Sequence, residues 1–168
     1  MRVGDGPRRP WLAGAIATVG SIGVLVSALL HGRGNHGVPH VLGTAALILS
    51  AVFIFSPFYL LKRHGGVQAG SKYFDTTAVV DRGVYGVVRH PQYLGYMLLV
   101  SGFALRSQSF WTVMLALCAN VFFYVQARKE EGFCVQSLGN AYEDYLKRVP
   151  RFNFVSGFLR HWRQARGR

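Results

Sequence analysis

The sequence predicts an all-α, polytopic membrane protein with about four transmembrane helices and an interfacial helix near its C-terminal end. Two features of composition carry this prediction: 51% of the 168 residues are hydrophobic and only 15% are charged, whereas soluble domains average about 25% charged residues. The third is a set of long uncharged stretches, most of them near the roughly 20 residues that a spanning helix needs. We expect a single membrane domain over residues 1–168.

The predicted spans are the four uncharged stretches Trp11–Leu30, Val41–Leu61, Gln92–Leu105 and Ser107–Ala127. The first has 20 residues, and the second and fourth have 21 each. The third has 14, about 21 Å of helix, so it is expected to start within the interface or to form a tilted hairpin with the fourth. The chain then divides into a helical pair, a polar cytoplasmic insert, a second helical pair and a cytoplasmic tail, at 1–62, 63–92, 92–127 and 128–168.

The distribution of basic residues predicts the orientation, because short loops rich in Lys and Arg stay in the cytoplasm. Of the 19 Lys and Arg residues, 17 lie before the first span, in the insert or in the tail, and only Arg33 and Arg106 lie in the opposite loops. We therefore expect a multi-pass protein with both termini in the cytoplasm. The net charge of +12 suits membrane lipids of an anionic leaflet. The sequence contains no nucleic-acid-binding module, so we expect no nucleic-acid partner. We also infer no obligate protein partner.

Histidine and cysteine usage predicts neither a metal site nor a disulfide framework. His31, His36 and His40 share a glycine-rich loop with no carboxylate or thiol near in sequence, so we expect no metal there. Cys118 and Cys134 form no CxxC pair, and we interpret both as packing residues.

The tail is predicted to form two helices. The first, Ser137–Val149, repeats apolar residues every three or four positions and is followed by Pro150, which ends a helix. The second combines arginines with an apolar stripe, a pattern typical of a helix in the interface of an anionic leaflet. Its stripe is Phe154, Val155, Phe158, Leu159 and Trp162, and its arginines are Arg160, Arg163 and Arg166.

Two dense polar clusters flank the second helical pair. Gly83–Gly95 reads GVYGVVRHPQYLG, and Gln126–Glu131 reads QARKEE. If the third and fourth helices are antiparallel neighbours, the two clusters meet at the same height. The sequence therefore predicts a pocket at the cytoplasmic face.

These residues resemble the isoprenylcysteine carboxyl methyltransferase and phospholipid methyltransferase group of integral membrane enzymes. The resemblance covers about Gln68 to Phe154 and rests on three ordered motifs. They are G-x-Y-x-x-x-R-H-P-x-Y-x-G at Gly83–Gly95, a pair of acidic residues at Glu130 and Glu131, and G-x-x-Y-x-x-Y-x-x-x-V-P at Gly139–Pro150. The resemblance implies an S-adenosylmethionine-dependent methyltransferase that acts on a lipid-borne or apolar small acceptor, with its cofactor in the cytoplasmic pocket.

The resemblance also implies which residues bind S-adenosylmethionine. Carried over by position, they are Thr77, Ala78, Val79, Val80, Tyr85, His90, Pro91, Gln92, Tyr93 and Glu130. Their chemistry is compatible with this use, because aromatic faces attract the sulfonium cation and a glutamate accepts hydrogen bonds from ribose hydroxyls or an ammonium group.

The acceptor decides whether a base is needed. A thiolate or carboxylate arrives nucleophilic, whereas an amine must lose a proton, for which His90 and Glu131 are the candidate catalytic residues. Asn120 and Gln126 are candidate substrate contacts; a polar Asn120 within a span otherwise indicates a hydrogen bond between helices. In the prenylcysteine branch an arginine suited to the acceptor carboxylate stands where this chain has Gln126, which argues against that acceptor.

A membrane NADPH-dependent sterol or enone reductase is the alternative enzyme class, because that group also carries R-H-P-x-Y-x-G. The residue after this glycine is usually acidic in the reductases, and here it is Tyr96, which favours the methyltransferase. A non-enzymatic membrane adaptor would give no reason for the two polar clusters to coincide.

Overall fold

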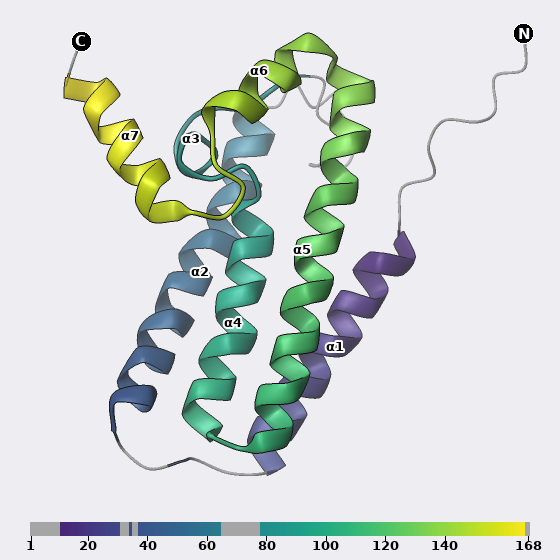
Figure 1. Cartoon of the computed structure of the whole chain (residues 1–168), viewed down its shortest axis with the longest axis vertical. Helices are drawn as coiled ribbons and strands as arrows, with labels where there is room; N and C mark the ends of the chain where they lie inside the picture. Colours follow the sequence, from purple (N-terminus) through teal and green to yellow (C-terminus); the bar gives the residue numbers. More distant parts are fainter. Residues whose placement is uncertain (1–10, 31–33, 35–36, 65–77, 167–168) are drawn as a thin grey trace, which may run out of the picture.

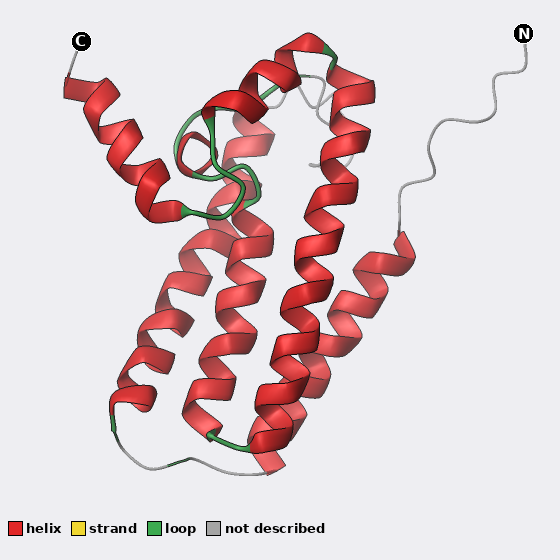
Figure 2. Ribbon diagram, viewed as in Figure 1, coloured by secondary structure: helices red, strands yellow, loops and turns green. Residues whose placement is uncertain are grey.

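A computed structural model describes residues 11–30, 34, 37–64 and 78–166, and these segments contain helices and connecting loops but no strand (Figure 2). The helices are α1 (Trp11–Leu30), α2 (Val38–His64), α3 (Val84–Val87), α4 (Pro91–Ser107), α5 (Phe110–Leu138), α6 (Asn140–Arg148) and α7 (Phe154–Arg166). The all-α prediction is confirmed for this part of the chain.

The long helices α2, α4 and α5 run side by side, and α1 lies at a slant against α4 and α5 (Figure 1). The turn between α4 and α5 lies at the lower end of this bundle. At the upper end, where α2 finishes and α4 begins, the short helices α3 and α6 gather, and α7 projects to one side. The antiparallel arrangement of α4 and α5 that the pocket prediction required is therefore present.

The predicted and observed helix limits differ most in α5. The predicted span ends at Ala127, but the helix continues without a break to Leu138. The residues beyond Ala127 are mostly compatible with a helix, and Gly139, at φ +58°, ends it in a conformation that favours glycine. Glu130 and Glu131 therefore lie on the same rigid helix as the apolar stretch, and α6 starts at Asn140 rather than Ser137.

Among the described residues, two helices, α2 and α5, are long and apolar enough to cross a membrane. The apolar segment of α1 whose side chains the structure describes, Val19–Leu30, is shorter. Large apolar side chains on the outside of α2 and α5 are exposed, for example Phe55 at 69% and Val121 at 65%. An outward-facing apolar surface of this kind is expected of helices surrounded by lipid.

Helices α2 and α4 approach one another closely at glycines. A Cβ on Gly95 would lie 2.7 Å from Ile54 Cγ1 and 2.9 Å from the Ile54 backbone nitrogen. Lower in the pair, a Cβ on Gly43 would lie 2.8 Å from the carbonyl oxygen of Gly102. These contacts require residues without a side chain, so the glycine that closes the first motif sets the distance between the two helices.

Candidate functional site

The first polar cluster folds into α3 and the beginning of α4. Gly83 precedes α3 at φ +57°, where a Cβ would lie 2.9 Å from the Leu60 side chain of α2. His90 stands immediately before α4, and Pro91 occupies its first turn, where the missing N–H of proline breaks no helical hydrogen bond. His90 is therefore held at the end of α4 that faces the second polar cluster.

Glu131 is the centre of a buried ion-pair network that joins three parts of the chain. Its side chain is only 10% exposed, and its Oε1 atom lies 3.2 Å from Arg89 Nη2 and 3.2 Å from His90 Nε2. Arg151, which follows α6, binds both carboxylate oxygens, with Nε 2.9 Å from Oε1 and Nη2 2.5 Å from Oε2. One carboxylate thus connects the start of α4, the upper part of α5 and the tail.

The network fixes the protonation of Glu131, which lies beyond the uncharged stretch of α5. Burial by itself raises the pKa of this carboxyl, but hydrogen bonds from His90 and Arg151 and the charge of Arg89 outweigh burial and lower the pKa to about 2. The bond to Glu131 in turn raises the pKa of Arg151. Because its partner is ionised, His90 Nε2 carries a proton, and in the neutral ring Nδ1 is then the acceptor.

Hydrogen bonds to backbone carbonyl groups join the third motif to the first. The Tyr145 hydroxyl donates to the Tyr85 carbonyl at 2.8 Å, and burial raises the pKa of Tyr145, so the hydroxyl keeps its proton. Arg89 Nη1 donates to the Leu146 carbonyl at 2.9 Å, and the Arg89 backbone N–H donates to the Pro150 carbonyl at 3.0 Å. These bonds hold the Arg-His-Pro segment and the tail in a fixed relation.

Several residues predicted to bind the cofactor surround His90. The Tyr93 ring centroid lies 5.8 Å from that of His90. Glu130 is exposed on α5, and its carboxylate interacts with the Tyr93 hydroxyl. Pro91 is buried, and Gln92 Nε2 donates to the Tyr96 hydroxyl at 3.2 Å. The two polar clusters do meet, as the sequence predicts.

The stretch before the first motif lies against α6. Val79 packs on the buried cluster of Tyr142, Tyr145 and Val149. Val80 is buried, whereas Ala78 is exposed. Thr77, also predicted to bind the cofactor, and His31 and His36 of the glycine-rich loop lie outside the described residues.

Asn120 forms a hydrogen bond between helices. The sequence allowed either this bond or contact with the methyl acceptor. Its Nδ2 donates to Ser101 Oγ of α4 at 3.0 Å, and its Oδ1 is buried without a hydrogen-bond partner in the described part of the chain. Gln126, the other predicted substrate contact, is buried on α5 nearer to Glu131.

We expect the Asn120→Leu variant to lose thermal stability while its KM for the acceptor stays near normal. The loss should be about 0.6 kcal/mol, the average measured for hydrogen bonds between membrane helices. Ser101→Ala removes the other partner and should give a similar loss in a thermal unfolding experiment. A raised KM in Asn120→Leu alone, with unchanged stability, would assign the side chain to acceptor binding instead.

Arg151, Tyr124 and Phe152 belong to the site although the sequence did not identify them. Arg151 Nη1 lies 3.1 Å from the Tyr124 hydroxyl, and the guanidinium lies 5.4 Å from the centre of that ring. The Phe152 ring centroid lies 6.2 Å from that of His90. The sequence did hold one signal for Arg151, because this residue directly follows Val-Pro of the third motif. Counting it only as one of the basic residues of the tail missed that signal.

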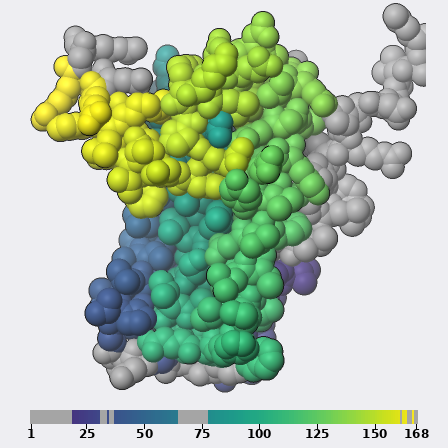
Figure 3. Space-filling model, in the orientation of Figure 1, coloured from purple at the N-terminus to yellow at the C-terminus, as the bar shows by residue number. Residues whose placement is uncertain are grey.

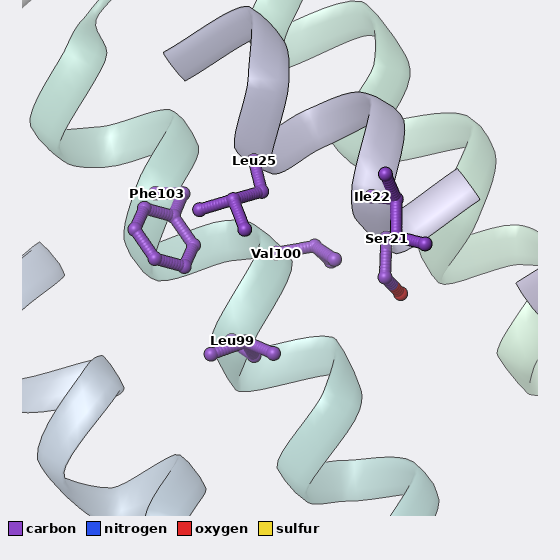
Figure 4. A pocket seen from close by; sticks show the side chains of 6 residues that line it. All are labelled: Ser21, Ile22, Leu25, Leu99, Val100 and Phe103. Carbon is purple, nitrogen blue, oxygen red and sulfur yellow. The ribbon is translucent and has the colours of Figure 1, made fainter. Parts of the chain in front are cut away.

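Two surface hollows lie at different depths. One is lined by Tyr124, Val125, Arg128 and Lys129 of α5, beside the Glu131 network. The other, of about 200 Å³, lies between α1 and α4 and is lined almost entirely by apolar atoms, with Leu99, Val100 and Phe103 on the α4 side (Figure 4). Val100 stands ten residues beyond His90, about 15 Å deeper along the helix.

Comparison with known proteins identifies the family. A model of the phospholipid methyltransferase family matches residues 38–141, which include α2, α4, α5 and both polar clusters. The chain belongs to this family. Among curated proteins, the chain is similar to protein-S-isoprenylcysteine O-methyltransferase of Schizosaccharomyces pombe, with 31% identity over 99 residues, 54% of this chain and 42% of that protein. It therefore spans less than half the length of this relative.

The family membership confirms the resemblance that the three motifs indicated. It identifies the chain as a member of a membrane methyltransferase family, in agreement with the apolar helices α2 and α5. Neither comparison supports the alternative of an NADPH-dependent reductase.

Proposed function

We propose that this chain transfers a methyl group from S-adenosylmethionine to a lipid-borne or apolar small acceptor at the cytoplasmic face of a membrane. The observation that carries the proposal is the Glu131 network. Arg89 and His90 belong to the first family motif, Glu131 is the second glutamate of the acidic pair, and Arg151 follows the third motif. Three motifs far apart in sequence thus build one buried polar site.

The charges of the site fit the proposed cofactor. Two arginines face one carboxylate, so the network carries surplus positive charge. Arg89 Nε is buried and has no hydrogen-bond partner within the described residues, and it is suited to an anionic group such as the cofactor's carboxylate. Tyr93 and Glu130 interact with one another, and their aromatic face and carboxylate suit a sulfonium and an ammonium group.

S-adenosylmethionine, when bound, supplies an electrophilic methyl group. The protein's task is then alignment and exclusion of water, since methyl transfer is an in-line displacement. His90 and Tyr93 are held by the first turn of α4, and Glu131 by the long helix α5. The hydrogen bonds between Arg89 and the tail hold these groups in fixed positions relative to one another.

Of the two candidate bases, the geometry favours His90. A carboxyl whose pKa is lowered to about 2 and whose two oxygens already bind Arg151 is a poor proton acceptor. In the neutral ring that donates through Nε2 to Glu131, Nδ1 is the nitrogen that can take up a proton. We therefore assign Glu131 the role of positioning residue, and His90 the role of base for acceptors that must lose a proton.

An apolar acceptor is supported by the surfaces around the site. The exposed apolar faces of α2 and α5 and the hollow between α1 and α4 lie below the polar network, where a molecule dissolved in lipid would arrive from the side. The relative's name specifies an isoprenylcysteine, an acceptor that is itself lipid-modified. We further propose that α1 and α4 join α2 and α5 as membrane spans, with both termini in the cytoplasm.

Calorimetry on the purified protein in detergent tests the cofactor. We expect S-adenosylmethionine and its demethylated product to bind at micromolar concentration and NADPH not to bind. His90→Ala and Glu130→Ala should weaken this binding. Arg33→Ala should not, because its loop is predicted to lie on the opposite side of the membrane. Binding of NADPH alone would overturn the proposal.

A further inference from the structure

Helix α7 contacts the first motif along the edge that carries Gly157 and Arg160. Gly157 is buried at this edge, and a Cβ there would overlap the carbonyl oxygen of Val87, so the two backbones are in direct contact. Arg160 reaches the same region and donates hydrogen bonds to the carbonyl oxygens of Gly86 and Arg148. The edge therefore contacts the first motif at the end of α3, three residues before His90.

The opposite face of α7 is apolar and uncovered. At about 100° per residue, these side chains lie roughly opposite Gly157 and Arg160 on the helix. They are Val155, Phe158, Leu159 and Trp162, with exposed fractions of 56%, 60%, 47% and 45%. Figure 3 shows α7, in yellow, standing out from the side of the molecule. An amphipathic helix normally turns its apolar face towards the protein body, and this one turns it away.

The position of α7 indicates a membrane surface as its partner. The helix begins at Phe154, whose ring centroid lies 6.3 Å from that of Phe53, inside the uncharged stretch of α2. From there the helix runs upwards and away from the side of the bundle (Figure 1). The Arg166 guanidinium lies 3.6 Å from the ring centre of Trp162. Aromatic and basic residues are both favoured at the interface between lipid and water.

The charge of α7 selects an anionic leaflet over a second copy of the chain. The helix contains three arginines and no acidic residue. Two copies that paired through this face would bring together two helices that both carry only positive charge, which is unfavourable. Anionic lipid headgroups attract the same side chains by about 1 kcal/mol each.

We propose that α7 docks on the anionic leaflet through this apolar face and thereby holds the first motif in its binding conformation. The contacts of Gly157 and Arg160 with Val87 and Gly86 are the physical link, since α7 cannot move without releasing them. By linkage, anionic lipid that stabilises the docked helix raises the affinity of the cofactor site. This second part rests on the proposed function; the docking itself does not.

Trp162 fluorescence tests the docking. In a Trp11→Phe/Trp111→Phe background, Trp162 is the remaining tryptophan. The protein is placed in vesicles of phosphatidylcholine, with or without phosphatidylglycerol, whose acyl chains carry bromine. We expect strong quenching by the brominated lipids and weak quenching by soluble acrylamide. Quenching by acrylamide alone would overturn the docking, and protection from both quenchers that is lost on dilution would assign the face to a second copy.

Calorimetry with S-adenosylhomocysteine in the same vesicles tests the link to the site. We expect tighter binding when phosphatidylglycerol is present. Arg163→Gln should reduce this lipid effect by about fivefold, the equivalent of ~1 kcal/mol, whereas Lys147→Gln, which removes an exposed positive charge from α6, should preserve it. Arg160→Gln should keep the quenching of Trp162 by lipid but lose the lipid effect on binding.

The two failures are distinguishable. Equal affinity with and without phosphatidylglycerol in the unaltered protein would overturn the link. Absence of binding in both kinds of vesicle would overturn the proposed function and leave the fluorescence result to decide the docking. Circular dichroism of each variant, compared with the unaltered protein, shows whether a loss reflects unfolding.

Discussion

The Glu131→Gln variant is expected to lose about 3 to 5 kcal/mol of stability and most of its affinity for S-adenosylmethionine. Removing one member of a buried ion-pair network leaves the others without compensation. Here Arg89 and Arg151 would remain largely buried without the carboxylate that both contact. Thermal unfolding and calorimetry measure the two losses. Glu143→Gln, an exposed carboxylate on α6, is the matched control and should change neither.

The same network predicts a defined sensitivity to acid. The pKa of Glu131 is lowered from about 4.5 to about 2 on folding, so its contribution to stability is fully present above pH 4.5 and is lost as the pH falls towards 2. The Glu131→Gln variant should lack this component of acid unfolding. Identical acid sensitivity in both proteins, or a fully stable variant, would contradict the role assigned to Glu131.

The Gly95→Val variant should lose about 1 to 3 kcal/mol of stability and should bind the cofactor poorly. A Cβ at this position would approach the Ile54 backbone nitrogen to 2.9 Å, and a backbone atom cannot move aside as a flexible side chain does. Separation of α2 from α4 would shift His90, which stands at the start of α4. Unfolding temperature and cofactor affinity are the measurements.

Gly132→Ala provides the comparison for Gly95. Gly132 lies on α5, and a Cβ there meets no atom within 4 Å. Alanine favours a helix by about 1 kcal/mol over glycine, so this variant should be as stable as the natural protein or more so. Equal tolerance of both substitutions would contradict the close contact between α2 and α4.

The sequence predicted the helices well because apolar stretches and their breaks are local signals. Trp11–Leu30 matches α1, and the meeting of His90 with the acidic pair followed from the antiparallel order of α4 and α5. The uncharged stretch ends at Ala127, but α5 continues for eleven more residues, because a change from apolar to polar composition does not end a helix. Gly139 does so through its backbone conformation.

The roles within the site were harder to predict because they depend on contacts across the fold. Glu130 and Glu131 are adjacent in sequence, but the helix exposes the first and buries the second. Arg151 contacts Glu131 only because the tail turns back at Pro150 over the Arg-His-Pro segment. A pattern along one chain does not specify such a return, whereas the family motifs indicated that the three segments act together.

Transfer of label from methyl-tritiated S-adenosylmethionine tests the proposed activity most directly. The purified protein is reconstituted in lipid vesicles that contain candidate acceptors, either phosphatidylethanolamine or a prenylated cysteine, and the products are extracted into organic solvent. We expect label in the organic phase with at least one of these acceptors, and less with His90→Ala when the acceptor is an amine. Cofactor binding without label in the organic phase for any apolar acceptor would contradict a membrane methyltransferase acting on lipid-borne substrates.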